Sequence, residues 1–130
     1  MELEVFTLCD AASDYQGRLC ILGVFDSIFA TDVPATHPSC SVVVRMRFKK
    51  VEVGKHTLTL HLVDYDGNMV IPPLNGEFQI QLPQQEQQGN INLVLNLQGL
   101  TFKTYGRYAI NLAIDGREIG SLPLTVRKPN

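Results

Sequence analysis

Apolar and polar residues alternate with a period of two through most of the chain. Every second residue is apolar in six segments: 42–48, 57–62, 78–82, 91–97, 107–114 and 121–127. A strand with this pattern has one apolar face and one polar face, whereas an amphipathic helix needs apolar residues three and four positions apart. No segment keeps the helical spacing over three turns. The pattern therefore predicts antiparallel strands that each cover a core on one side.

The first two expected strands are less regular. Residues 2–9 carry apolar side chains on both faces, and so do residues 18–29. For the second of these, an apolar run on both faces predicts a strand that is covered twice or lies centrally in its sheet. Gly23, in its interior, predicts a bulge or the close approach of an aromatic side chain such as Phe6.

Turn residues separate the expected strands. Asp66-Gly67 and Asp115-Gly116 lie between alternating segments, and Asp-Gly supplies the positive φ angles of a type I′ hairpin. Pro34 and Pro38 predict irregular connections, because proline cannot donate to a strand ladder. No repeat or linker interrupts the pattern, so residues 1–130 are expected to form a single domain.

Strands joined by short turns bury their apolar faces best when two sheets pack together. The chain is therefore expected to be an all-β, antiparallel two-sheet β-sandwich. An eight-stranded barrel is the alternative, and the Pro-rich breaks favour the sandwich. The stretch from Tyr105 to Tyr108 is similar to the tyrosine corner of immunoglobulin-like domains, which suggests that general architecture.

Charge and hydropathy indicate the expected surroundings of the protein. The net charge of -2 creates no attraction to nucleic acid or to anionic membranes. The first residues alternate between acidic and apolar, unlike a secretory signal, and no apolar run is as long as a membrane span. We therefore expect a cytoplasmic protein with neither nucleic acid nor membrane as a partner.

The chain has three cysteines, Cys9, Cys20 and Cys40, and their spacing fits no zinc module. In a reducing compartment they are expected to be free, buried and inert. A disulfide between Cys9 and Cys20 is the alternative, if the first two strands form a symmetric hairpin.

Histidines give no clear metal site. His56 and His61 lie five residues apart and so face opposite sides of one strand. His37 and Cys40 could supply two ligands, but no third ligand has a matching spacing. Residues 64–68, of sequence DYDGN, lack the positions of a calcium loop and are better explained as a hairpin turn.

No motif for catalysis is visible either. The chain has no nucleophile elbow, no phosphate-binding glycine loop and no marked pair of carboxylates. The sequence thus predicts no catalytic, metal-binding or cofactor-binding residue, no cofactor and no enzyme. It also lacks tryptophan, which disfavours a carbohydrate-binding platform.

Two surface features remain as candidate sites. Arg45, Arg47 and Lys49 form a basic row, which either protects a solvated sheet face or binds an anionic partner. Alternation also directs several aliphatic residues away from the core: Val43, Val63, Val94, Ala109 and Ala113. If these share one sheet, they form a small apolar patch suited to a two-fold dimer interface.

Four stretches of the sequence resemble a bacterial family of small all-β domains with no assigned function. They are residues 4–12 (EVFTLCDAA), 17–26 (GRLCILGVFD), 63–67 with 71–74 (VDYDG and IPPL), and 108–116 with 122–124 (YAINLAIDG and LPL). The resemblance spans nearly the whole chain. It implies a bacterial cytoplasmic source and the same fold, and it brings no activity, ligand or catalytic residue.

The function expected from the sequence is therefore a non-catalytic interaction or structural domain. Its partner is expected to be a second copy of the chain or another protein. A small-ligand or carbohydrate-binding module is the first alternative, and it requires a groove lined by Tyr15, Tyr65 or Tyr105. An enzyme whose site is assembled from loops is the second alternative.

Overall fold

A computed structural model describes all residues from 1 to 130 and contains nine strands and one short 3₁₀ helix. In chain order these are β1 (Glu2–Tyr15), β2 (Arg18–Val24), β3 (Ser27–Phe29), β4 (Ala35–Lys49), η1 (Lys50–Glu52), β5 (Gly54–Asp64), β6 (Leu74–Ile80), β7 (Gln88–Phe102), β8 (Gly106–Ile114) and β9 (Arg117–Arg127). No helix has the length and apolar character needed to cross a bilayer.

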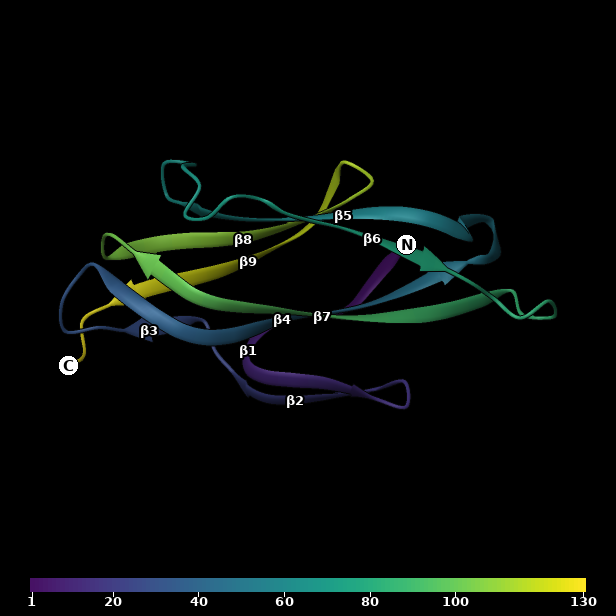
Figure 1. The fold of residues 1–130 in the computed structure, drawn as a ribbon, viewed down its shortest axis with the longest axis horizontal. Coiled ribbons are helices and arrows are strands. Elements are labelled where there is room, and N and C mark those ends of the chain that lie inside the picture. Colours follow the sequence, from purple (N-terminus) through teal and green to yellow (C-terminus); the bar gives the residue numbers. More distant parts are fainter.

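The strands form two sheets that pack face to face (Figure 1). Sheet A has the order β2-β1-β4-β7, and sheet B has the order β3-β9-β8-β5-β6. The prediction of an all-β, two-sheet domain is confirmed, and the immunoglobulin-like architecture stays a prediction. The prediction that all strands are antiparallel is wrong for one pair, since β3 runs parallel to β9. The chain crosses from sheet A to sheet B before β3, so no tight turn forces antiparallel pairing there.

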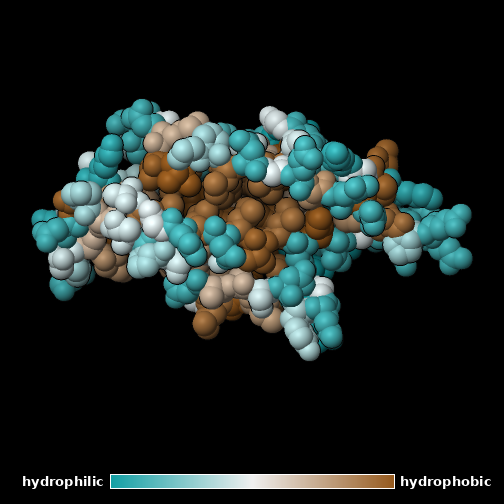
Figure 2. Space-filling view, in the orientation of Figure 1, coloured by the Kyte–Doolittle hydropathy of each residue, from teal (hydrophilic) through white to brown (hydrophobic).

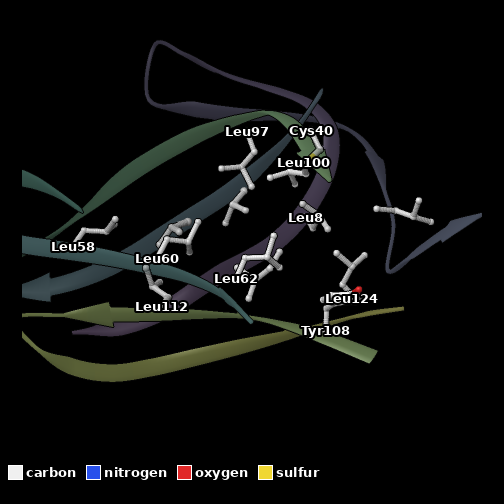
Figure 3. Close-up of a cluster of buried hydrophobic side chains, with 14 of the residues drawn as sticks. Leu8, Cys40, Leu58, Leu60, Leu62, Leu97, Leu100, Tyr108, Leu112 and Leu124 are labelled. Atoms are coloured by element: carbon white, nitrogen blue, oxygen red, sulfur yellow. The ribbon is translucent and has the colours of Figure 1, made fainter. Parts of the chain in front are cut away.

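The core lies between the sheets and is built from the predicted alternating positions (Figure 3). Val42, Val44 and Met46 of β4 are fully buried and face residues of β5 and β8 such as Leu60 and Leu112. Phe102 packs edge-on against Tyr108, with ring centroids 4.9 Å apart. The hydroxyl of Tyr108 donates to the carbonyl of Thr104 at 2.7 Å, so the one polar atom of this buried ring is satisfied.

Turn chemistry explains the ends of several strands. Asp115 and Gly116 both have positive φ, at 53° and 79°, as the prediction of a type I′ turn requires. The prediction of a type I′ turn is wrong for Asp66-Gly67, since only Gly67 has a positive φ. This turn is held by Asp64 Oδ1, which accepts hydrogen bonds from the backbone amides of Asp66 and Asn68. The Asp64 carboxylate therefore organises its own hairpin turn.

The second strand departs from its prediction. β2 lies at the edge of sheet A, and six of its seven residues are exposed. It is thus neither covered twice nor central. Gly23 has a φ of +72°, and a Cβ atom there would lie 2.4 Å from a carboxylate oxygen of Asp10. The expected approach by Phe6 occurs elsewhere, at Gly120, where a Cβ would lie 2.9 Å from the Phe6 ring and from Leu3.

Gly120 is therefore expected to determine how closely β1 approaches sheet B. The Gly120→Ala variant should be less stable by about 1–3 kcal/mol, because the added methyl overlaps two core side chains. Gly76→Ala is the matched control, since Gly76 also lies in a strand and has no neighbour within 4 Å of the added Cβ. Urea unfolding of both variants measures the difference, and equal stabilities would contradict the packing described here.

Candidate functional site

The first candidate is a hairpin that leaves the body of sheet A. β1 pairs with β4 from Glu2 to Cys9, and with β2 from Cys9 to Tyr15. Residues 10–24 therefore form a two-stranded ribbon that pairs only with itself, and we call it the hairpin arm. In Figure 1 the chain bends at this point, so the arm folds back below β4 and β7.

The tip of the arm is tied to the outer face of sheet A. The Gly17 carbonyl accepts a hydrogen bond of 3.1 Å from Asn92 Nδ2 on β7. Asn92 and Val94 lie two residues apart on one face of β7, and Val94 pairs with Val43 of β4. Val43 points away from the core between Val42 and Val44, yet it is fully buried. The position of the tip accounts for this burial, because the arm lies over the same face.

The side of the arm that faces away from the sheet is apolar. Leu22, Val24 and Tyr15 are 70%, 64% and 63% exposed, and Cys20 is exposed beside them. Figure 2 shows brown atoms projecting at the lower margin of the molecule, where Figure 1 places the arm. The only neighbour of β2 is β1, so the other edge of β2 presents unpaired backbone groups. Such an edge is a template for pairing with another chain.

A second apolar surface lies at the opening between the sheets. Figure 2 shows apolar side chains across the middle of this view, between the upper and lower layers. Several apolar residues of the edge strands β6 and β7 are only half-buried against the core: Leu74, Phe78, Ile91, Leu93 and Leu95. These side chains close one side of the core, so their exposure follows from the sandwich itself.

The two arginines of the predicted basic row share one carboxylate of the same chain, which offsets one of their two positive charges. One carboxylate, Glu4 of β1, lies 3.1 Å from Arg45 Nε and 2.9 Å from Arg47 Nε. Its hydrogen bond with Arg47, together with the charges of both guanidinium groups, lowers the pKa of Glu4. Arg45 also donates to Asn92 Oδ1 at 2.9 Å. The row thus joins three strands of sheet A and the tip of the arm.

Lys49, the third residue of the predicted row, stands apart from the two arginines. Its side chain forms no ion pair, and its backbone amide donates to Glu52 Oε1 at 3.0 Å. Sequence reasoning missed Glu4 as the partner of the row. The sequence contained a signal for this partner, because Glu2 and Glu4 alternate with apolar residues and so lie on the polar face of the first strand.

His56, a half-buried histidine near the start of β5, is at the centre of a polar cluster. His56 Nδ1 lies 2.6 Å from Asp115 Oδ2, and His56 Nε2 lies 2.6 Å from the carbonyl oxygen of Glu52. A carboxylate and a carbonyl only accept hydrogen bonds, so this arrangement favours the charged imidazole, in which both ring nitrogens donate. The bond to Asp115, followed by the one to Glu52, raises the pKa of His56.

The same cluster ties three parts of the fold together. Asp115 also accepts a 2.9 Å bond from the amide of Thr57, and its bond to His56 lowers the pKa of its carboxyl group. The ring of His56 stacks on Phe78 of β6 at 5.6 Å. A shallow depression of about 540 Å³ adjoins the cluster, and Arg117 and Glu118 line it as well. With both nitrogens occupied, His56 acts as a clamp between β5, η1 and the β8–β9 turn.

His37 and Cys40, which were considered as two metal ligands and not expected to form a site, are not brought together. His37 packs on the ring of Phe25 at 5.5 Å, and its Nε2 atom has no hydrogen-bond partner. Cys40 lies in the core between the sheets. His56 and His61 lie on opposite faces of β5, as expected. The structure contains no cluster of three or more metal-ligating side chains.

All three cysteines are free in the structure, but they differ in exposure. Cys9 and Cys40 are buried and Cys20 is exposed, so the prediction of burial is wrong for Cys20. The alternative of a Cys9–Cys20 disulfide is also wrong for this structure. Cys9 pairs with Val24 and Cys20 pairs with Ser13, because the hairpin turn lies at Gln16 and Gly17.

The residues predicted as a dimer face do not share one surface. Val43 is fully buried, so it cannot contact a second copy. Val94 lies beside it on sheet A, whereas Val63 lies on sheet B, paired with Ala109. Alternation correctly directs these side chains away from the core, but it does not say to which sheet each strand belongs. The proposed apolar patch is therefore divided between the two outer faces of the sandwich.

A groove with tyrosines is present, as the small-ligand alternative requires. It has a volume of about 390 Å³ and is lined by Tyr65, Tyr105 and Tyr108 together with Asp64, Asp66 and Arg107. The hydroxyl of Tyr105 donates to the Ala30 carbonyl at 3.0 Å, and Lys128 lies over its ring. Tyr65 is 79% exposed and is the tyrosine of this groove that is most accessible to a ligand.

Comparisons with known proteins identify a family and two distant structural likenesses. Residues 4–127 match the model of a family described as a family of unknown function, DUF6941. No curated protein matches the sequence. A glycosyl hydrolase family 2 member from Bacteroides cellulosilyticus DSM 14838 is 13% identical with a TM-score of 0.45, over 95% of this chain and 15% of that one.

The second solved structure is a beta-glucuronidase from glycoside hydrolase family 2. It is 18% identical with a TM-score of 0.36, over 75% of this chain and 11% of that one. This chain therefore spans only a small part of the length of either enzyme.

Thiol reactivity should follow the observed burial. Burial raises the pKa of Cys40 to about 11 and also raises that of Cys9, and the thiolate is the reactive form. A maleimide reagent at neutral pH should modify one thiol quickly in the native protein and all three after unfolding. Cys20→Ser should remove the fast reaction. Rapid modification of two thiols in the folded protein would contradict the assigned burial.

The His56 clamp should make stability depend on pH. Because the pKa of His56 is raised by folding, its contribution is complete below the unfolded pKa of roughly 6.5 and is lost as the pH rises through the folded value. The stability lost in His56→Gln should therefore be larger at pH 5.5 than at pH 9. His61→Gln, on the same strand, is the control, because His61 forms no ion pair. A loss for His56→Gln that is the same at both pH values would refute the clamp.

Proposed function

This chain belongs to the DUF6941 family of unknown function, and we propose that it is a non-catalytic protein-interaction domain whose hairpin arm docks a strand of a partner. The proposal rests on one observation: β2 is an apolar edge strand with an open backbone edge. An extended segment added to such an edge gains main-chain hydrogen bonds, and the adjacent side chains give specificity.

The energy available at this edge supports the proposal. Each Å² of apolar surface removed from water contributes roughly 25 cal/mol, and Leu22, Val24 and Tyr15 are all more than half exposed. Edge strands are usually blunted by proline, inward charges or shortness, because otherwise they aggregate. β2 has seven residues, no proline and one charged residue, Arg18, at its first position. A partner that covers this edge explains why it stays unprotected.

The polar groups of the molecule are consistent with the same proposal. Arg45 and Arg47 both bind the Glu4 carboxylate, and the nitrogens of His56 are both occupied by Asp115 and Glu52. These groups hold strands together. A site that binds or transforms a substrate would need some of them to be released first.

Binding of a small ligand or carbohydrate is the second candidate function. The groove with Tyr65 and Tyr105 favours it, because an aromatic face beside carboxylates and an arginine suits a hydroxyl-rich ligand. It ranks second because Tyr105 and Tyr108 both use their hydroxyls within the fold. Only the Tyr65 side chain remains free to stack.

Site-specific photo-crosslinking in the native host tests the proposed function. A benzophenone side chain at Leu22 should give a discrete cross-linked protein, whereas the same group at Tyr65, which is also exposed, should give none. Mass spectrometry of the product identifies the partner. If products form from position 65 or from Leu95 at the sheet opening, and none forms from position 22, the hairpin arm is not the docking surface.

A further inference from the structure

We infer that the partner of the hairpin arm is a second copy of this chain, with the two β2 strands paired antiparallel about a two-fold axis at Leu22. This inference rests on the proposed function, and it names the partner that pairs with the open edge of β2. The pairing would join the two four-stranded A sheets into one continuous sheet. Two-fold pairing of edge strands is a self-complementary contact, so one surface serves both subunits.

Among the four edges of the two sheets, β2 is the one suited to such pairing. β3 is only three residues long. β6 carries Glu77, which faces Lys55 at 3.8 Å, together with exposed Asn75 and Gln79. The outer face of β7 carries asparagine and glutamine side chains on either side of Val94, and one of them, Asn92, already binds the tip of the arm. β2 combines an open edge with exposed apolar side chains, Ile21, Leu22 and Val24, whereas the apolar residues of β6 and β7 are buried or half-buried against the core.

The charges that flank β2 favour a second copy as the occupant. Arg18 begins the strand, and Asp26 follows its end, where the amide of Phe25 still bonds to the Leu8 carbonyl of β1. Both residues are exposed, and neither forms an ion pair within the chain. Leu22 lies midway between them in sequence. An antiparallel copy centred on Leu22 therefore brings each Arg18 to the end of the other subunit's β2, beside the side chain of Asp26, whose own carbonyl bonds to the amide of Thr125 on β9.

The apolar side chains match in the same register. Leu22 meets Leu22 of the other copy at the axis, and Cys20 lies opposite Val24. Directly opposed side chains of antiparallel strands are about 4.5–5.5 Å apart at Cβ, close enough for contact. The interface thus has an apolar centre and an ion pair at each end. A parallel copy would place Arg18 beside Arg18 and lose both pairs.

Charge reversal tests the partner and its direction together. Sedimentation equilibrium of the purified wild type should show a species of twice the 14.5 kDa monomer mass. Arg18→Asp alone and Asp26→Arg alone should each weaken the dimer by about tenfold or more, because both ends of the interface then carry like charges. The double variant should restore the dimer to within about threefold of the wild type. Equal weakening in the double variant would overturn the inferred pairing.

Cysteine cross-linking tests the register. In a Cys20→Ser background, Leu22→Cys should form a disulfide-linked dimer on mild oxidation with oxidised glutathione. Tyr65→Cys in the same background is the control and should form no disulfide-linked dimer. If native Cys20 cross-links efficiently and Leu22→Cys does not, the axis lies at Cys20 and the inferred ion pairs are wrong.

The outcomes separate this inference from the proposed function. A protein that stays monomeric up to about 1 mM, while position 22 still cross-links to a different protein in cells, overturns the second copy and keeps the docking arm. If position 22 gives no product in cells and the purified protein is monomeric, both are overturned.

Discussion

The bend of β1 at Cys9 is the feature on which the rest of sheet A depends. Up to this residue β1 pairs with β4 and supplies core residues such as Leu8, and after it β1 pairs with β2 alone. After the bend the two arm strands pair only with each other, because β1 no longer pairs with β4 and β2 has no other neighbour. The same bend covers Val43 on the outer face of the sheet. The separate arm and the buried outer face are therefore consequences of one change of direction.

Long-range polar contacts fix this arrangement. Glu4 holds Arg45 and Arg47 on β4, and Asn92 links Arg45 to the tip of the arm. On sheet B, His56 joins β5 to Asp115, which is 59 residues away in the chain. Each contact crosses between strands distant in sequence. These contacts fix the pairing register of the strands, because hydrophobic packing in the core has no direction and does not fix it alone.

The sequence predicted the strands and the core well, because alternation depends only on neighbouring residues. It failed where the outcome depends on which strands become neighbours. Apolar residues on both faces of 18–24 fit a central strand or a docking strand equally well, and only the sheet order distinguishes them. Pro38 was expected in a loop but lies in β4, which tolerates it because β1 has already left that edge. The partnership of His56 with Asp115 was likewise invisible, since no local pattern links residues so far apart.

In the proposed dimer the outer edge of β2 is unpaired in the single chain and is covered by another copy. Residue-resolved hydrogen exchange by NMR, recorded at low and at high micromolar protein concentration, distinguishes these two states. The outward-facing amides of β2 should exchange fast at low concentration, and these amides alone should exchange more slowly at high concentration, while amides of β4 stay protected throughout. Amides of β2 that are all as protected as those of β4 at low concentration, or that do not respond to concentration, would contradict the proposed dimer.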